Sequence, residues 1–210
     1  MDVQVIKHPL AASRLTVMRD ATSDSSVFRA ALREVTTLLV YEATRDIAAE
    51  KFEIATPVST ATGVRLANPP LLVPVLRAGL GMADAAHKLL PEATMGFVGL
   101  ARDEKTHEPR AYMESLPDDL TGRHVIVLDP MVATGGSLVR CCQMIADRGC
   151  TDISVVCVLI APEGVNELER SRLPLTVTTT SVDDGLNSDA FIVPGLGDAG
   201  DRQFGQYRRF

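Results

Sequence analysis

The chain has 210 residues, of which 46% are hydrophobic and 23% charged, so it can bury the core of one sizeable domain and does not have the composition of a disordered protein. Its formal net charge of −6 argues against a nucleic-acid-binding protein, which normally carries a basic excess. No apolar run approaches the ~20 residues needed to span a bilayer, and residues 1–10 are too mixed in polarity for a signal peptide, so we expect a cytoplasmic protein with no membrane partner.

Residues 25–50 are predicted to form one long amphipathic helix. Apolar residues such as Phe28, Leu32 and Val35 recur there at helical spacing, with charged residues between them. Residues 23–26 provide candidates for the N-cap of this helix. One face of the helix should therefore be buried against the rest of the molecule.

After residue 70, short apolar runs alternate with helix-compatible segments. The predicted strands are 71–76, 95–100, 125–128 and 153–160, and the predicted helices are 79–90, 135–148 and 163–171. This alternation predicts a single α/β domain over residues 1–210, with a mostly parallel central sheet flanked by helices. Ligands of such sheets bind beyond the carboxyl ends of the strands.

Residues 125–137 are the most informative stretch of the sequence. Four apolar residues end at Asp129, and a loop of small residues with two glycines follows before a helix-compatible segment. Such a loop can turn backbone N–H groups toward an anion at a helix N-terminus, and Thr134 and Ser137 add hydroxyl donors. An acid beside a phosphate-binding loop suits a ligand with hydroxyls and a phosphate, such as a sugar phosphate.

Arg77 also directly follows a predicted strand, so it should lie at the same edge of the sheet as Asp129. Ala78, Gly79 and Gly81 leave the backbone around it bare. A diphosphate group needs a forked donor and exposed amides, and this loop has both. Pairing of Arg77 with a carboxylate at the sheet edge is the structural alternative.

Residues 102–117 are polar and charged and have no clear periodicity. They are either a solvated loop or hairpin, or a lid that closes over a reactive ligand.

Residues 192–202 are rich in glycine and contain Pro194. They either form a structural loop or present backbone groups to a flat, neutral ligand.

The cysteines and histidines carry no recognisable site. Cys141, Cys142, Cys150 and Cys157 show no metal-ligand spacing and are predicted to be core thiols in a reducing compartment. We expect no catalytic role for His87, His107 or His124, and we expect His87 to lie on a helix surface.

Residues 125–137 resemble the phosphoribosyl-diphosphate-binding signature of the type I phosphoribosyltransferases, and residues 191–202 resemble the uracil-binding segment of the uracil phosphoribosyltransferases. Four shorter stretches are similar to that family as well. They are 8–10, 41–46, 75–81 and 102–104. The resemblance runs from about residue 8 to about residue 205.

The resemblance implies an enzyme of pyrimidine salvage that makes UMP and diphosphate from uracil and 5-phospho-α-D-ribose 1-diphosphate (PRPP). It implies the type I phosphoribosyltransferase fold with a small C-terminal base-binding hood and a flexible lid. The catalytic residues would be Asp129 and Arg77. PRPP would be bound by Arg77, Arg102, Asp129, Pro130, Met131, Val132, Ala133, Thr134, Gly135, Gly136, Ser137 and Asp198, and uracil by Ile192, Gly197, Asp198 and Ala199.

The resemblance further implies Mg²⁺ held by the diphosphate and water without a dedicated protein site, GTP as an allosteric activator, and a homo-oligomer, either a dimer or a tetramer. The chain departs from the family at three places. Pro130 replaces the second of two adjacent acids, Phe191 replaces a common tyrosine and so lacks its hydroxyl, and residues 206–210 are an unusual tail to which we assign no role.

Two other functions are compatible with the motifs. The same fold could act on another base, such as a purine or xanthine, which a panel of bases assayed with PRPP would reveal. The chain could also be a non-catalytic regulator that senses nucleotides and binds RNA, which the absence of a basic stripe disfavours.

Overall fold

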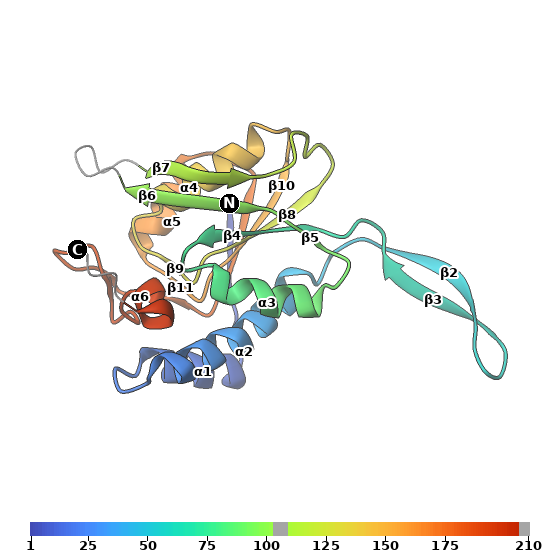
Figure 1. Ribbon diagram of the computed structural model, residues 1–210, viewed down its shortest axis with the longest axis horizontal. Helices are drawn as coiled ribbons and strands as arrows, with labels where there is room; N and C mark the ends of the chain where they lie inside the picture. The colour runs from blue at the N-terminus through green and yellow to red at the C-terminus, as the bar shows by residue number, and fades with distance from the viewer. Residues whose placement is uncertain (103–108, 206–210) are drawn as a thin grey trace.

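A central sheet of eight strands organises the molecule (Figure 1). The structure, a computed structural model, describes residues 1–102 and 109–205. Along the sheet the strands are β1 (Asp2–Val5), β12 (Leu175–Thr179), β10 (Asp152–Val156), β8 (His124–Leu128), β4 (Leu71–Leu76), β6 (Phe97–Arg102) and β7 (Pro109–Ser115), and β5 (Thr94–Met95) also pairs with β4. Only the β6–β7 pair is antiparallel among these, so the prediction of a mostly parallel α/β sheet is confirmed.

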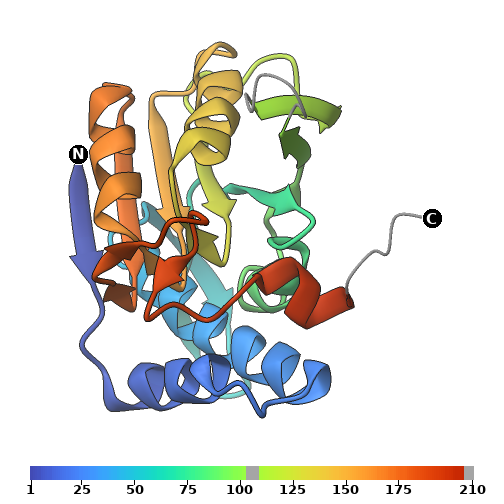
Figure 2. The same ribbon diagram turned by 90° about the vertical axis from the view of Figure 1, so that its left-hand side faces the viewer.

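Helices cover both faces of this sheet (Figure 2). One face carries α1 (Pro9–Arg19), α2 (Ser25–Ala43) and α3 (Leu80–Leu89), and the other carries α4 (Gly136–Ala146) and α5 (Pro162–Arg170). Side chains of β8 point alternately to the two faces of the sheet. Ile126 and Leu128 pack in the core under α1, α2 and α3, and Val125 and Val127 pack in the core under α4 and α5. The predicted helices at 79–90, 135–148 and 163–171 are confirmed.

The helix predicted over residues 25–50 is wrong at its C-terminal end. α2 stops at Ala43, where the Thr44 hydroxyl bonds to the carbonyl of Val40, and Ala49–Ala55 forms strand β2 instead. In β2 the apolar residues Phe52 and Ile54 alternate with charged ones, which is a strand period and not a helical one.

β2 pairs with β3 (Thr60–Leu66) to form an antiparallel hairpin arm that projects from the body (Figure 1). Every residue of β2 is exposed. This arm, residues 49–66, was not predicted from the sequence.

Small sheets extend the carboxyl edge of the main sheet. β9 (Met131–Val132), β11 (Leu159–Ile160) and β13 (Ser181–Val182) form one, and β14 (Gly185–Leu186) and β15 (Ile192–Val193) form a hairpin. The strand predicted over 153–160 is therefore two strands, because Val158 leaves the main sheet and donates to the carbonyl of Pro130. The run 95–100 is likewise divided between β5 and β6. No helix of the described residues is long and apolar enough to cross a membrane.

Candidate active site at the carboxyl edge of the sheet

Asp129 lies where β8 ends, as predicted, and its carboxyl group is largely enclosed. The pKa of Asp129 is raised to about 7: burial is the largest cause, a hydrogen bond from the Met131 amide acts against it, and the negative charge of Asp198 adds to it. This electrostatic interaction links Asp129 to Asp198 in the C-terminal segment, far away along the chain. The site thus holds a carboxyl group that titrates near neutral pH.

The loop predicted to bind phosphate, residues 133–137 and called the phosphate loop below, leads from β9 into α4. Gly135 is the N-cap of α4 and has a φ of +83°, a left-handed conformation that glycine adopts readily. It offers no side chain to cap the first N–H groups of the helix, so these groups can bind an anion. α5 packs closely behind the loop, because a Cβ atom on Gly164 would lie 2.8 Å from the Ala133 carbonyl oxygen.

The Arg77 loop, residues 77–81, follows β4, the strand next to β8. A Cβ atom on Gly79 would lie 2.7 Å from the Val75 nitrogen and would overlap the carbonyl oxygen of Leu128. The loop therefore packs directly against the strand end that precedes Asp129. Arg77 Nη2 lies 3.1 Å from Oδ1 of Asp201, a partner that the sequence did not predict. Arg77 thus pairs with a carboxylate, as in the structural alternative, but the carboxylate lies on helix α6 (Ala199–Phe204) and not on a strand of the sheet.

The segment predicted to bind the base, residues 192–199 and called the base segment below, runs from β15 to the start of α6. Ile192 and Ala199 are buried, whereas Gly197 and Asp198 are exposed. Gly195 and Gly197 have φ values of +62° and +80°. The segment thus exposes backbone at its turn while its apolar ends are anchored in the core.

A cavity of about 320 Å³ lies beside the base segment, lined by Phe191, Asp198, Asp201 and Arg202. Phe191 is exposed there, so its ring is available to a ligand. The cavity is large enough for a small planar ring.

Arg19 ties the base segment to α1, which sequence reasoning missed. Its guanidinium binds both carboxylate oxygens of Asp183, at 2.7 and 2.6 Å, and the carbonyl of Gly195 at 2.8 Å. Burial would raise the pKa of Asp183, but hydrogen bonds from Arg19, Ser181 and Gly195 lower it below its usual value. The carboxylate of Asp183 is therefore held ionised.

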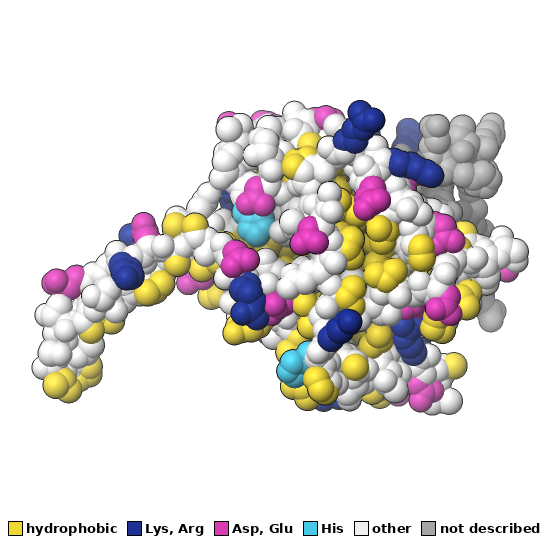
Figure 3. Space-filling model, turned by 180° about the vertical axis from the view of Figure 1, so that it is seen from behind, with side chains coloured by type: hydrophobic (Ala, Val, Ile, Leu, Met, Phe, Trp, Pro, Cys, Tyr) yellow, Lys and Arg dark blue, Asp and Glu magenta, His cyan; other side chains and the backbone are white. Residues whose placement is uncertain are grey.

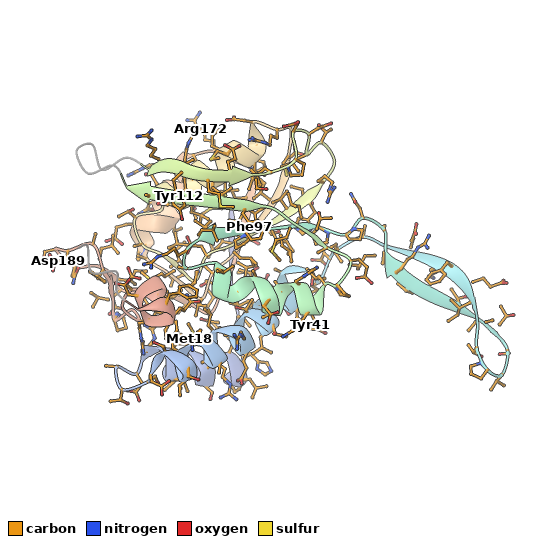
Figure 4. The ribbon with its side chains drawn as sticks, in the orientation of Figure 1. Met18, Tyr41, Phe97, Tyr112, Arg172 and Asp189 are labelled. Carbon is orange, nitrogen blue, oxygen red and sulfur yellow. The ribbon has the colours of Figure 1, made fainter. Side chains whose placement is uncertain are left out.

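Arg202 connects α6 to the turn between α1 and α2. It donates to the carbonyls of Met18, Leu196 and Asp20, and its guanidinium lies 4.5 Å from the centre of the Phe28 ring. Figure 4 shows Met18 at the end of α1 that faces α6.

Of the remaining predicted residues, Arg102 ends β6 opposite Pro109, and its side chain is not described. The residues that flank the undescribed part of the segment 102–117 form the β6–β7 hairpin. Tyr112 of β7 packs over Gly99 of β6, since a Cβ atom added to Gly99 would lie 2.6 Å from the Tyr112 ring (Figure 4). Residues 103–108 and 206–210 lie outside the described residues, so the lid stays a prediction and the tail has no assigned role.

The histidines and cysteines lie away from this edge or within the core. His124 is at the start of β8, where its Nε2 lies 2.9 Å from Ser154 Oγ beside a cavity of about 500 Å³ at the opposite edge of the sheet. His87 is exposed on α3, as expected, and His107 lies outside the described residues. The four cysteines are buried, and burial raises their pKa values, which confirms them as core thiols.

A family model described as uracil phosphoribosyltransferase matches residues 5–206. The chain is 54% identical over 205 residues to a uracil phosphoribosyltransferase of Corynebacterium diphtheriae, and 53% identical to that of Corynebacterium efficiens. Each alignment covers 98% of this chain and 97% of the relative.

Among solved structures, the chain is similar to the AQ2163 protein from Aquifex aeolicus. The TM-score is 0.91 at 34% identity, and the match covers 97% of this chain and 98% of that one. A hypoxanthine-guanine phosphoribosyltransferase from Bacillus anthracis has a TM-score of 0.51 at 16% identity over 74% of this chain and 79% of that one, which is a likeness of fold alone.

Proposed function

Because this chain belongs to the uracil phosphoribosyltransferase family, we propose that it makes UMP and diphosphate from uracil and PRPP at the carboxyl edge of its central sheet. The reaction salvages a pyrimidine base. One observation carries the assignment of this edge: the phosphate loop, the Arg77 loop and the base segment, which are far apart in the sequence, meet where β4 and β8 end. Residues 1–210 would act as one domain, since both cores pack on the same sheet.

The 5-phosphate of PRPP would bind the phosphate loop. The N-terminal N–H groups of α4 carry the positive end of the helix dipole, and Thr134 and Ser137 provide hydroxyls. Asp129, with Pro130, Met131 and Val132 shaping the turn after it, would accept a hydrogen bond from a ribose hydroxyl. When ionised, Asp129 would also stabilise the positive charge that builds on the ribose ring as the bond from C1 to diphosphate breaks.

The diphosphate would bind the Arg77 loop. Arg77 offers a forked donor, and the bare backbone around Gly79 can approach the phosphates closely. Arg102 would reach PRPP from the β6–β7 hairpin.

Mg²⁺, which phosphoribosyltransferases generally use with PRPP, would neutralise the diphosphate when bound. The described residues contain no group of three or more His, Cys, Asp and Glu side chains that could hold a metal ion. We propose that the ion would be coordinated chiefly by diphosphate oxygens and water, as Mg²⁺ commonly is beside phosphates.

Uracil would lie against the base segment. Its edge presents an acceptor, a donor and an acceptor in turn, and backbone groups around Ile192, Gly197 and Ala199 can match that pattern without charged side chains. Asp198 would face both substrates. Holding N1 of uracil against C1 of the ribose is the contribution to catalysis that this segment makes.

We propose that the enzyme is a homo-oligomer, a dimer or a tetramer. The support is the arm, on which Val58 is 93% exposed and Val64 65% exposed, and Figure 3 shows hydrophobic side chains along it. Exposed apolar side chains gathered on a projecting hairpin are typical of an interface. The Val64→Glu variant should shift the mass measured by light scattering toward the monomer, whereas an unchanged mass would exclude the arm.

The proposal of GTP as an allosteric activator is supported by the resemblance to the family. Initial rates measured with and without GTP test it.

The test of the function is UMP formation from uracil, PRPP and Mg²⁺ by the purified protein. We expect turnover with uracil and the loss of turnover when PRPP is replaced by ribose 5-phosphate, which lacks the leaving group. A protein that turns over hypoxanthine or xanthine and leaves uracil unchanged would contradict the proposal.

A further inference from the structure

The side-chain amide of Gln203 lies between the two substrate segments. Gln203 is on α6 and only 1% exposed. Its Nε2 donates to the carbonyl of Ala78 at 3.0 Å and to the carbonyl of Ala199 at 2.8 Å. Ala78 directly follows Arg77, and Ala199 directly follows Asp198. A single nitrogen atom thus bridges the loop proposed to bind diphosphate and the segment proposed to bind uracil.

The orientation of this amide is determined by its neighbours. Both groups facing Nε2 are carbonyl oxygens, which only accept hydrogen bonds, so the NH₂ end must point to them. Gly81 leaves the space that the amide occupies, because a Cβ atom there would overlap Oε1 of Gln203. Arg29 also donates to the backbone carbonyl of Gln203 at 2.6 Å, which fixes the end of α6 to α2.

The amide of Gln203 forms the bridge at the cost of leaving one of its own polar atoms unpaired. Oε1 of Gln203 is buried and has no hydrogen-bond partner among the described residues. A buried unpaired carbonyl is unfavourable, and an apolar side chain of the same length would avoid it. What the amide provides, and an apolar side chain would not, is the bridge between Ala78 and Ala199.

A second contact joins the same elements. Asp201, two residues before Gln203, pairs with Arg77 at 3.1 Å, and a Cβ atom on Gly200 would lie 3.6 Å from Arg77 Nη2. This contact is about one-third exposed, so it can rearrange when an anion reaches Arg77, while the buried Gln203 bridge stays in place.

We propose that Gln203 is a positioning residue that couples the two subsites, so that PRPP in the Arg77 loop raises the affinity for uracil at the base segment. This inference rests on the proposed function. PRPP fixes the Arg77 loop, the bridge fixes Ala199 and the neighbouring Asp198, and uracil then meets an ordered surface. Coupling of this kind is reciprocal, so uracil raises the affinity for PRPP by the same factor.

The test compares the wild type with Gln203→Met, which keeps the length of the side chain and removes both donors. The coupling factor is the dissociation constant of PRPP from its binary complex with the enzyme, divided by the KM for PRPP at saturating uracil. Both constants come from initial rates measured over a grid of PRPP and uracil concentrations. We expect a factor of at least about 5 in the wild type, within the usual range of such couplings. In Gln203→Met the coupling factor should fall to about 1 and the KM for uracil should rise in parallel. The dissociation constant of PRPP from the binary complex, measured by calorimetry, should change less than about threefold, because the Arg77 loop itself is unaltered.

Thr36→Val is the matched control. It removes another fully buried hydrogen bond, from Thr36 Oγ1 to the Leu32 carbonyl within α2, and should lower Tm without changing the coupling factor. Gln203→Asn keeps the amide but is one methylene too short to reach both carbonyls, so it should lose the coupling even if Gln203→Met does not fold. A wild-type coupling factor in either folded Gln203 variant, or a factor of 1 in the wild type, overturns the proposal.

A separate measurement tests whether the Arg77 loop binds diphosphate at all. If Arg77→Gln bound PRPP as tightly as the wild type in calorimetry, the Arg77 loop would not be the diphosphate site, whatever the coupling factor of the Gln203 variants.

Discussion

Gly79 packs against the backbone of Leu128, at the point where the Arg77 loop crosses the end of β8. A side chain on Gly79 would overlap the carbonyl oxygen of Leu128 and lie within 2.8 Å of Val75. The loop that carries Arg77 is therefore in direct contact with the end of the strand that precedes Asp129. A displacement of either one should displace the other.

Gly79→Ala should separate the two loops. We expect the affinity for PRPP to fall by at least 10-fold and stability to fall by about 1–3 kcal/mol, the usual effect of overpacking. Calorimetric titration and thermal unfolding measure both. Gly122→Ala is the control, because Gly122 has a φ of +69° with nothing within 4 Å of an added Cβ atom, so it should lose stability and keep its PRPP affinity. Equal loss of affinity in both variants would contradict the role of the contact.

Asp129→Asn should lower kcat more than it raises KM. An ionised carboxylate stabilises charge that exists only in the transition state, so removing it should reduce kcat by roughly 10²-fold or more. Steady-state kinetics with both substrates measure the division between kcat and KM. A change confined to KM would instead assign Asp129 to binding of the ribose in the ground state.

The pKa of about 7 for Asp129 predicts two effects of pH. Activity at subsaturating PRPP should rise as pH increases toward 7, because Asp129 becomes ionised. Asp198→Asn should shift this rising part of the pH–activity profile to lower pH, because it removes a charge that raises the pKa of Asp129.

Stability should show the opposite trend, because between about pH 4 and 7 the folded protein keeps a proton on Asp129 that the unfolded chain releases. Asp129→Asn should therefore be more stable than the wild type at pH 8, by on the order of 4 kcal/mol, and no more stable at pH 4. Denaturant titrations at both pH values check this, and equal differences at the two would be inconsistent with a raised pKa.

Base choice should follow the edge pattern of uracil. Cytosine exchanges an acceptor for a donor at position 4 and a donor for an acceptor at N3, so two hydrogen bonds with the base segment would become repulsive. We expect kcat/KM for cytosine to be lower by roughly 10⁴-fold, and 5-fluorouracil, which keeps the edge, to be used. Comparable turnover of cytosine and uracil would show that the base segment does not select the base.

The strand ends that carry Arg77 and Asp129 could be predicted because each follows a local run of apolar residues. The Arg77–Asp201 and Ala78–Gln203 contacts could not, since each joins positions more than 120 residues apart and depends on how α6 packs. The arm was missed because only Phe52 and Ile54 alternate in β2, and the alanines before them are compatible with a longer helix. The break between β10 and β11 at Val158 could not be predicted, because residues 153–160 are apolar on both sides of it. What changes at Val158 is the sheet in which the chain pairs.

α3 and α4 leave neighbouring strands toward opposite faces of the sheet. The two connections diverge as they leave β4 and β8, and in sheets of this kind such a point of divergence is where ligands bind. The position of the candidate site therefore comes from the route of the chain and does not depend on which side chains fill the cores. A family built on this route can change the molecule it accepts by altering a few edge residues, without repacking either layer beneath them.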